Sequence, residues 1–128
     1  MGQNVDTILK VTREHEALRL LVLFGSRGRG EETPRSDWDL GYIADGSLDV
    51  AGLRADLISA LQTEEIDLVD LDRANGLLRY RAARDGRPIF ESEEQAFERF
   101  WLAAVGFWCD AESVLEESYD AVLEGLSE

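Results

Sequence analysis

Residues 18–39 read LRLLVLFGSRGRGEETPRSDWD, and this stretch decides the fold. Residues 18–24 are an almost continuous apolar run that stops at a glycine, which is typical of a strand buried on both faces. Residues 25–36 contain three glycines, a proline and several charges, so they are predicted to form a loop. The β-prone segment WDLGYI, residues 38–43, predicts a second strand. Two strands therefore flank a charged, glycine-rich loop.

Two aspartates stand where the loop meets the second strand. Residues two apart on a strand project to the same face, so Asp37 and Asp39 present two carboxylates side by side. Such carboxylates repel each other unless a cation neutralises them, and Mg²⁺ prefers oxygen ligands. The segment IDLVDL, residues 66–71, predicts a third strand, whose Asp67 reaches the same site if that strand lies beside the second. Asp70 points to the opposite side.

Three carboxylates on adjacent strands suit two Mg²⁺ ions that stabilise the attacking and leaving oxygens of a phosphoryl displacement. Asp37, Asp39 and Asp67 are therefore the candidate catalytic and metal-binding residues. Asp67 is also a candidate acceptor for the proton of the attacking hydroxyl. The alternative for Asp67 is a solvated position on an edge strand.

The loop supplies candidate nucleotide contacts. Gly25 lets the backbone approach a triphosphate closely, and Ser26 offers an N–H and a hydroxyl. Arg27, Arg29 and Arg35 can neutralise phosphate charge, with surface ion pairing as the alternative for each. The segment is neither a P-loop nor a GxGxxG fingerprint, because no Gly-Lys-Ser/Thr follows and its glycines are spaced differently.

These residues carry a family resemblance. The segment GSRGRGEETPRSDWDL, residues 25–40, resembles the GSx10DxD motif of the polymerase-β-like nucleotidyltransferase superfamily, and is similar to its minimal nucleotidyltransferase group, which includes the MntA-type antitoxins. IDLVDLD, residues 66–72, resembles the third-carboxylate strand of that group. LLRYRAARDGRPIFES, residues 77–92, is similar to its closing helix and strand. The resemblance covers residues 18–92.

The resemblance implies an α/β (α+β) fold, a small mixed sheet flanked by helices, with Asp37, Asp39 and Asp67 as Mg²⁺ ligands and Gly25 and Ser26 as the nucleotide contact. It implies a Mg²⁺-dependent nucleotidyltransferase that uses ATP. Many proteins of this group pair with a helical HEPN-domain RNase toxin and block it by attaching AMP to a tyrosine. A HEPN toxin is therefore the expected partner, and its tyrosine hydroxyl is the expected acceptor.

Apolar spacing and turn residues predict the remaining elements. They are helices over residues 5–16, 50–61 and 74–83, a strand over 87–91 and a long helix over 93–123. We expect a nucleotidyltransferase domain over residues 1–92 and a helical extension over 93–128. The aromatic residues of the extension spread over more than one helical face, which leaves both core packing and a partner surface open.

The charge of the chain excludes some partners. A net charge of −14 repels nucleic-acid phosphates, so no direct nucleic-acid binding is expected. No Lys or Arg follows Arg99, whereas seven acidic residues do, so residues 110–128 are complementary to a basic protein or are simply solvated. Neither a signal peptide nor an apolar run of membrane-spanning length is present, so the protein is expected in the cytoplasm and away from the membrane.

Two single residues have structural interpretations. Cys109 is the only cysteine, which excludes an internal disulfide, and it is expected to be a small apolar residue in a helix. His15, the only histidine, is expected at the end of the first helix, where a cation meets the negative end of the helix dipole.

Three other functions compete with the antitoxin enzyme. A small-molecule nucleotidyltransferase, such as one that modifies aminoglycosides, uses the same triad but needs an acceptor pocket, and this chain is short for that. A polymerase or tailing enzyme needs a basic groove, against which the net charge argues. An antitoxin that acts by binding alone would keep the fold while its triad decays, and here the triad is intact.

Overall fold

The computed structural model describes residues 2–109. Residue 109 lies within the predicted long helix, so the rest of that helix and the expected acidic surface over residues 110–128 lie outside the described residues. No helix among the described residues is long and apolar enough to cross a membrane.

A four-stranded mixed sheet forms the centre of the molecule. Its strands are β1 (Leu18–Phe24), β2 (Trp38–Ala44), β3 (Ile66–Asp70) and β4 (Arg87–Glu91). They lie in the order β3-β2-β1-β4, with β1 antiparallel to both β2 and β4, and β2 parallel to β3. Strand β3 is the direct neighbour of β2, as the predicted approach of Asp67 to Asp39 requires.

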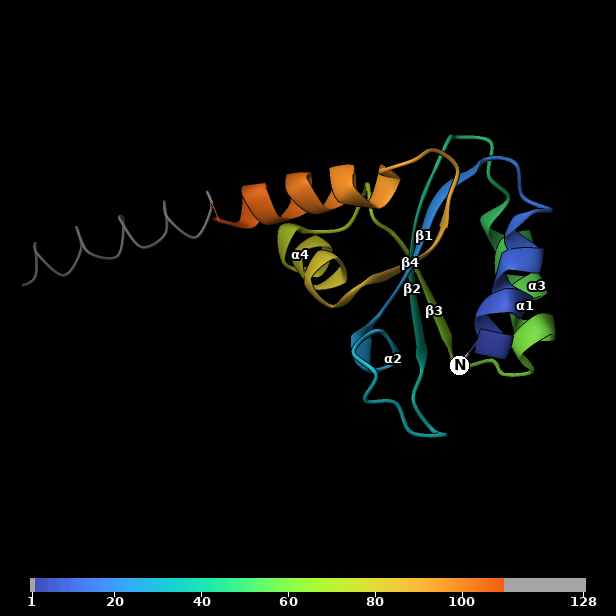
Figure 1. Ribbon diagram of the computed structural model, residues 1–128. Coiled ribbons are helices and arrows are strands. Elements are labelled where there is room, and N and C mark those ends of the chain that lie inside the picture. Colours follow the sequence, from blue (N-terminus) through green and yellow to red (C-terminus); the bar gives the residue numbers. More distant parts are fainter. Residues whose placement is uncertain (1, 110–128) are drawn as a thin grey trace, which may run out of the picture.

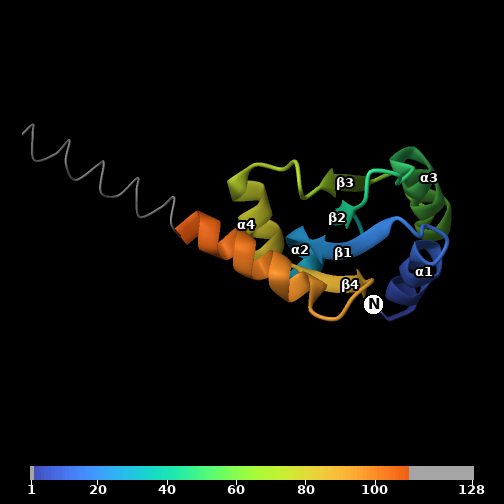
Figure 2. The same ribbon diagram turned by 90° about the horizontal axis from the view of Figure 1, so that it is seen from above.

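Helices cover both faces of the sheet. Helices α1 (Gly2–Thr12) and α3 (Val50–Leu61) lie on one face, and α4 (Gly76–Asp85) lies on the other together with a helix over residues 96–109 (Figures 1 and 2). A single helical turn, α2 (Gly25–Gly28), follows β1 directly at one end of the sheet (Figure 1). The predicted mixed sheet flanked by helices is confirmed.

Strand β1 is central because both of its faces are covered. Six of its seven residues are buried, and Arg19 is the exposed one. Leu21 and Leu23 pack in a core with α1 and α3, whereas Leu20 and Val22 pack in a second core with α4 and the helix over residues 96–109. An apolar run without alternation is therefore what this position requires.

Strand β2 alternates instead. Trp38, Leu40 and Tyr42 are buried in the core beneath α1 and α3. Since side chains alternate along a strand, Asp39 and Ile43 face α4. Ile43 accordingly packs in the second core. The face that carries Asp39 is thus the one that α4 covers.

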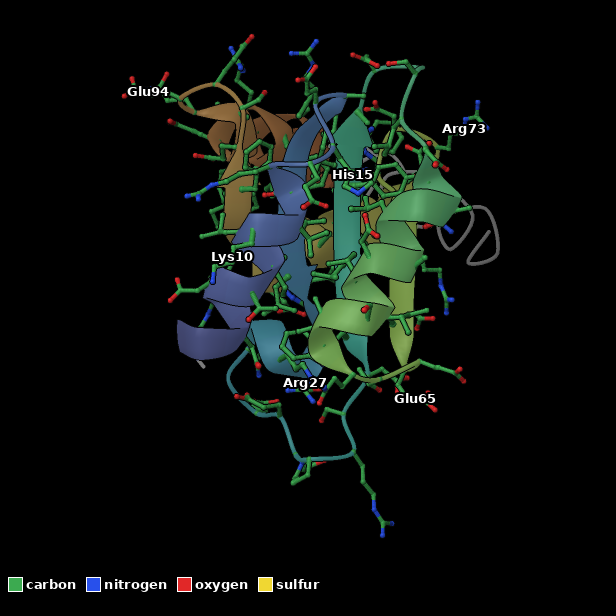
Figure 3. All side chains as sticks on the ribbon, turned by 90° about the vertical axis from the view of Figure 1, so that its right-hand side faces the viewer. Lys10, His15, Arg27, Glu65, Arg73 and Glu94 are labelled. Carbon is green, nitrogen blue, oxygen red and sulfur yellow. The ribbon has the colours of Figure 1, made fainter. Side chains whose placement is uncertain are left out.

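The first helix begins at Gly2 and ends at Thr12 rather than covering residues 5–16, so both predicted ends are wrong, and so is the expectation for His15. Helix α1 ends at Thr12, whose hydroxyl donates to the carbonyl of Leu9 at 2.7 Å, a bond that competes with continuation of the helix. His15 lies three residues beyond the last residue of the helix, in the turn that follows it. Its Nε2 instead lies 2.8 Å from a carboxylate oxygen of Asp56 on α3 (Figure 3).

Other boundaries also shift. The predicted loop over residues 25–36 begins with α2, so it is not entirely a loop. Helix α4 begins at Gly76 rather than residue 74, because the Asn75 side chain caps it by accepting from the Leu78 N–H at 2.9 Å. The last described helix begins at residue 96 rather than 93. Cys109 lies on that helix, as predicted, and is exposed.

Candidate active site

The three predicted aspartates lie at one end of the sheet. Asp39 lies opposite Phe24 across the antiparallel β1–β2 pair and opposite Asp67 across the parallel β2–β3 pair. Phe24, Asp39 and Asp67 therefore form one row across three strands, which we call the carboxylate row. Asp37 lies one residue before β2, at the same end of the sheet, and is exposed.

Gly25 is the residue that lets the chain turn beside this row. It follows β1 directly, its φ of +66° lies in the left-handed region, and it begins α2. A Cβ atom at this position would collide with the carboxylate of Asp39. The turn after β1 thus requires glycine for two reasons, its backbone angle and the close approach of a carboxylate.

Arg27 fixes the loop that leads to Asp37. Its guanidinium donates to the carbonyl of Ser36 at 3.0 and 3.2 Å and stacks over the ring of Trp38, with its Cζ 4.2 Å from the centroid. The N–H of Trp38 donates to the carbonyl of Glu65 at 2.9 Å, which joins the starts of β2 and β3. Figure 3 shows Arg27 and Glu65 at the same end of the molecule. These contacts hold the segment on both sides of Asp37.

The pKa of Asp39 is raised above the ordinary value of an aspartate. Burial raises its pKa, the nearby carboxylates of Asp67 and Asp37 raise it further, and Arg29 lowers it. None of the three aspartates forms an ion pair with a basic side chain within residues 2–109. Negative charge is thus concentrated at the row without a direct ion pair to any basic side chain of the described residues, although Arg29 is close enough to lower the pKa of Asp39.

The donor set fits Mg²⁺. All three side chains offer carboxylate oxygens, which this hard cation prefers. Across the described part of the chain, no three His, Cys, Asp or Glu side chains converge closely enough to enclose a metal ion. Mg²⁺ at nucleotide sites commonly binds one or two carboxylates and completes its shell with water and substrate phosphates, so an open carboxylate set is suitable.

A pocket of about 340 Å³ opens beside Asp39. Its walls come from the end of β1, the following turn and the covering helix α4. The lining residues are Phe24, Gly25, Arg29, Asp39, Leu78, Arg81, Arg84 and Asp85. Sequence reasoning missed the four residues from α4. Arg81 and Arg84 are three apart on one helix, but only the tertiary structure shows that this helix covers the carboxylates.

Two of the three arginines that line this pocket are held by ion pairs with acidic side chains. Asp85 accepts from Arg84 at 3.0 and 3.1 Å and from Arg29 at 3.2 Å, and Arg29 also donates to Glu31 at 3.0 Å. The hydrogen bonds from Arg84 lower the pKa of Asp85, burial opposes this, and the hydrogen bond from Arg29 lowers the pKa further. Arg81 makes no ion pair with any described residue. The pocket therefore holds one cation that is free to bind an anionic ligand.

The predicted loop contacts separate into two groups. Gly25 and Arg29 line the pocket, and Ser26 follows Gly25 in the first turn of α2. Arg27 is engaged with Ser36 and Trp38, and neither Arg27 nor Arg35 lines the pocket. The structure thus brings Gly25 and Arg29 together with Asp39, while Arg27 supports the loop.

Comparison with known proteins agrees with this geometry. A family model described as polymerase beta nucleotidyltransferase matches residues 6–95. The chain is 28% identical over 96 residues to the protein adenylyltransferase MntA of Aphanizomenon flos-aquae, and 32% identical over 95 residues to that of Shewanella oneidensis. These matches cover 65% and 71% of this chain. They cover 63% and 68% of the relatives, so the chain spans about two thirds of their lengths.

Solved structures give the same result. A toxin–antitoxin structure with AMP-PNP superposes with a TM-score of 0.75 at 28% identity, covering 94% of this chain and 98% of that one. The MNT antitoxin in complex with a tri-AMPylated HEPN toxin of Shewanella oneidensis superposes with a TM-score of 0.70 at 27% identity, covering 96% and 99%.

Replacing Gly25 tests the turn. Gly25→Ala introduces a Cβ at positive φ and against the Asp39 carboxylate, so the free energy of unfolding should fall by more than about 1 kcal/mol. Gly46→Ala is the matched control, since a Cβ there meets no atom within 4 Å, and it should change stability by less than about 0.5 kcal/mol. Urea denaturation measures both. Equal effects of the two substitutions would contradict the assigned role of Gly25.

Removing the Asp39 charge tests the electrostatics of the row. A carboxyl group whose pKa is raised on folding destabilises the native state above that pKa, and this destabilisation disappears as the pH falls towards its ordinary value of 3.8. In EDTA at pH 7, Asp39→Asn should therefore be more stable than the wild type, and the difference should close on acidification. Asp72→Asn, at an exposed loop carboxylate, should show no such difference. Denaturation over a pH series measures the difference, and a difference as large at pH 4 as at pH 7 would argue against repulsion.

Proposed function

The chain belongs to the polymerase beta nucleotidyltransferase family, and from this premise we propose that it transfers AMP from ATP to a tyrosine hydroxyl of a HEPN RNase toxin, which it thereby neutralises. The observation that carries the proposal is the carboxylate row, with Asp37 beside it, next to a pocket lined by arginines. The names of the relatives support AMP transfer, and solved complexes with a HEPN toxin support the partner.

Asp37, Asp39 and Asp67 would hold two Mg²⁺ ions. Their oxygen donors and the absence of an ion pair at any of them in the described chain support this assignment. When bound, Mg²⁺ would stabilise negative charge on the phosphate oxygens of the substrate. Burial and the neighbouring carboxylates raise the pKa of Asp39, so its ionised form is destabilised, and a bound cation would offset that cost.

The ATP triphosphate would lie in the pocket beside Asp39. Gly25 allows the close backbone approach, and Ser26 stands in the first turn of α2, where N–H groups have no partner within the helix. Arg81 would bind phosphate directly because no described acidic side chain pairs with it. Arg29 and Arg84, held by Asp85, would supply fixed positive charge.

Nucleotide contacts by Arg27 and Arg35 have less support than contacts by the arginines that line the pocket. The engagement of Arg27 with Ser36 and Trp38 supports a positioning role, in which it holds the loop that carries Asp37. Arg35 is exposed, outside the pocket lining, and remains a candidate phosphate contact from the loop.

The residues support an in-line transfer. The acceptor oxygen forms a bond to the α-phosphorus of ATP, and the bond from that phosphorus to the bridging oxygen breaks, releasing pyrophosphate. A carboxylate oxygen of Asp67 is proposed to accept the hydroxyl proton, because Asp67 is exposed at the row and open to an incoming acceptor.

Residues 93–128 are proposed as the partner-binding extension of a nucleotidyltransferase domain over residues 1–92. In the described part of the extension, Leu102 and Phe107 are each 59% exposed and Trp101 is 41% exposed, which is unusual for side chains of this size. Phe100 and Ala104 pack the same helix on the domain. One side of this helix thus serves the core, and another offers apolar surface to a protein partner.

The two alternative functions would require different structural features. An antitoxin that acts by contact alone would need only the extension, so the retained carboxylate row and its pocket favour the enzyme. A small-molecule nucleotidyltransferase would need a pocket for its acceptor as well as for the nucleotide, and the pocket beside Asp39, of about 340 Å³, lies at the lower end of the range for a single small-molecule site.

Intact-mass spectrometry tests the transfer. The chain, ATP, Mg²⁺ and a cognate HEPN toxin should give toxin molecules heavier by one or more AMP units, and Asp37→Asn with Asp39→Asn should abolish this while the fold persists. Asp72→Asn, which removes an exposed carboxylate outside the row, should keep the activity. Full activity of the double variant would refute the mechanism, and tight binding without a mass gain would favour inhibition by contact.

A charge placed on the extension tests the partner surface. Leu102→Glu should weaken binding to the toxin by about tenfold or more and leave the melting temperature unchanged, because the side chain is exposed. Val50→Glu is the control, since Val50 is 38% exposed on α3 at the other face of the sheet. Isothermal titration calorimetry measures both affinities. Unchanged binding by Leu102→Glu would place the interface elsewhere.

A further inference from the structure

A second pocket, of about 350 Å³, opens on the α4 face of the sheet. Its apolar part is formed by Leu20 of β1, Ile43 of β2 and Phe100 of the last described helix. Leu20 stands four residues before Phe24, so along the strand this pocket lies about 13 Å from the carboxylate row. Figure 3 agrees, because Glu94, next to the lining residue Glu93, lies at the end of the molecule opposite Arg27. We call it the distal pocket.

The distal pocket is basic in an acidic protein. Arg19, Arg79 and Arg99 line it, against the single carboxylate of Glu93. Arg99 donates to Glu93 at 3.0 Å, and Arg19 reaches Asp45 at 3.4 Å. Three guanidinium groups around one cavity are unexpected in a chain of net charge −14, so the cavity concentrates positive charge that the overall composition does not explain.

Arg79 is the one arginine of this pocket that has no acidic partner among the described residues. Its Nε is buried and has no hydrogen-bond acceptor among residues 2–109, and no ion pair to it occurs in that range. The only partner described for its guanidinium is the ring of Phe100, with the Cζ 5.7 Å from the centroid. Burying a cationic donor without an acceptor costs free energy, which an oxyanion in the pocket would recover.

We propose that the distal pocket binds a small organic anion, with one carboxylate or phosphate group held by Arg79 and supported by Arg19 and Arg99. The planar guanidinium fork of Arg79 suits two oxygens of such a group. The rest of the ligand is apolar, about one ring in size, and packs on Leu20 and Phe100, because the pocket volume lies at the lower end of the range for small-molecule sites. The site is independent of AMP transfer at the carboxylate row.

Nuclear magnetic resonance of the Arg79 Nε–Hε group tests the proposal directly. The probes are 3-phenylpropanoate and phenyl phosphate. Inorganic phosphate is the control that carries the charge without the ring, and 3-phenylpropanol is the control that carries the ring without the charge. Both ring-bearing anions should shift the Arg79 signal saturably, at about tenfold lower concentration than inorganic phosphate. The neutral alcohol should not shift it. Whichever anion binds more tightly identifies the ligand as a carboxylate or a phosphate.

Matched variants make the test decisive. Arg79→Gln should abolish the shifts of the Leu20 and Ile43 amides, whereas Arg73→Gln, whose side chain is 89% exposed on the β3–α4 loop, should keep them. If Arg79→Gln fails to fold, Arg99→Gln decides, because that side chain is 63% exposed and should weaken binding by about threefold or more. Shifts that are equal in wild type and Arg99→Gln, or that are confined to residues around Asp39, overturn the proposal.

Discussion

The carboxylates of Asp39 and Asp67 occupy paired positions on two parallel strands, and within residues 2–109 no basic side chain forms an ion pair with either. Their mutual repulsion is the constraint on which the rest of the site depends. Burial raises the pKa of Asp39 and the adjacent carboxylates raise it further, so the protein holds these charges together at a cost. The proposed binding of a cation and a polyanionic substrate would offset this cost.

The surrounding structure makes this arrangement possible. Strand β1 is buried on both faces and fixes the position of Phe24, while Gly25 turns the chain without displacing the Asp39 carboxylate. Helix α4 then covers the same face and contributes Arg81 and Arg84. Negative charge on the sheet is thus met by positive charge on the helix across a pocket, which is the charge distribution that a metal–triphosphate substrate requires.

Much of this could be read from the sequence, because it depends on local pattern. The almost continuous apolar run of β1 predicts a strand buried on both faces, and the two-residue spacing of Asp37 and Asp39 predicts two neighbouring carboxylates. The mixed sheet and the family are both confirmed. The role of Arg27 and the place of α4 depend on tertiary contacts, namely the Trp38 ring and the packing of α4 on β1. The partner of His15 lies 41 residues away on α3, which no local pattern reveals.

The most direct test of the proposal that Asp37, Asp39 and Asp67 hold two Mg²⁺ ions is to count the metal ions that bind there. A crystal of the chain with Mn²⁺ in place of Mg²⁺ and with α,β-methylene ATP, whose α–β bridge resists cleavage, can be measured for anomalous scattering. Two manganese peaks should appear, bound by Asp37, Asp39 and Asp67, with the phosphates between them and Arg81. Nucleotide bound in the pocket with no manganese at these carboxylates would contradict the account.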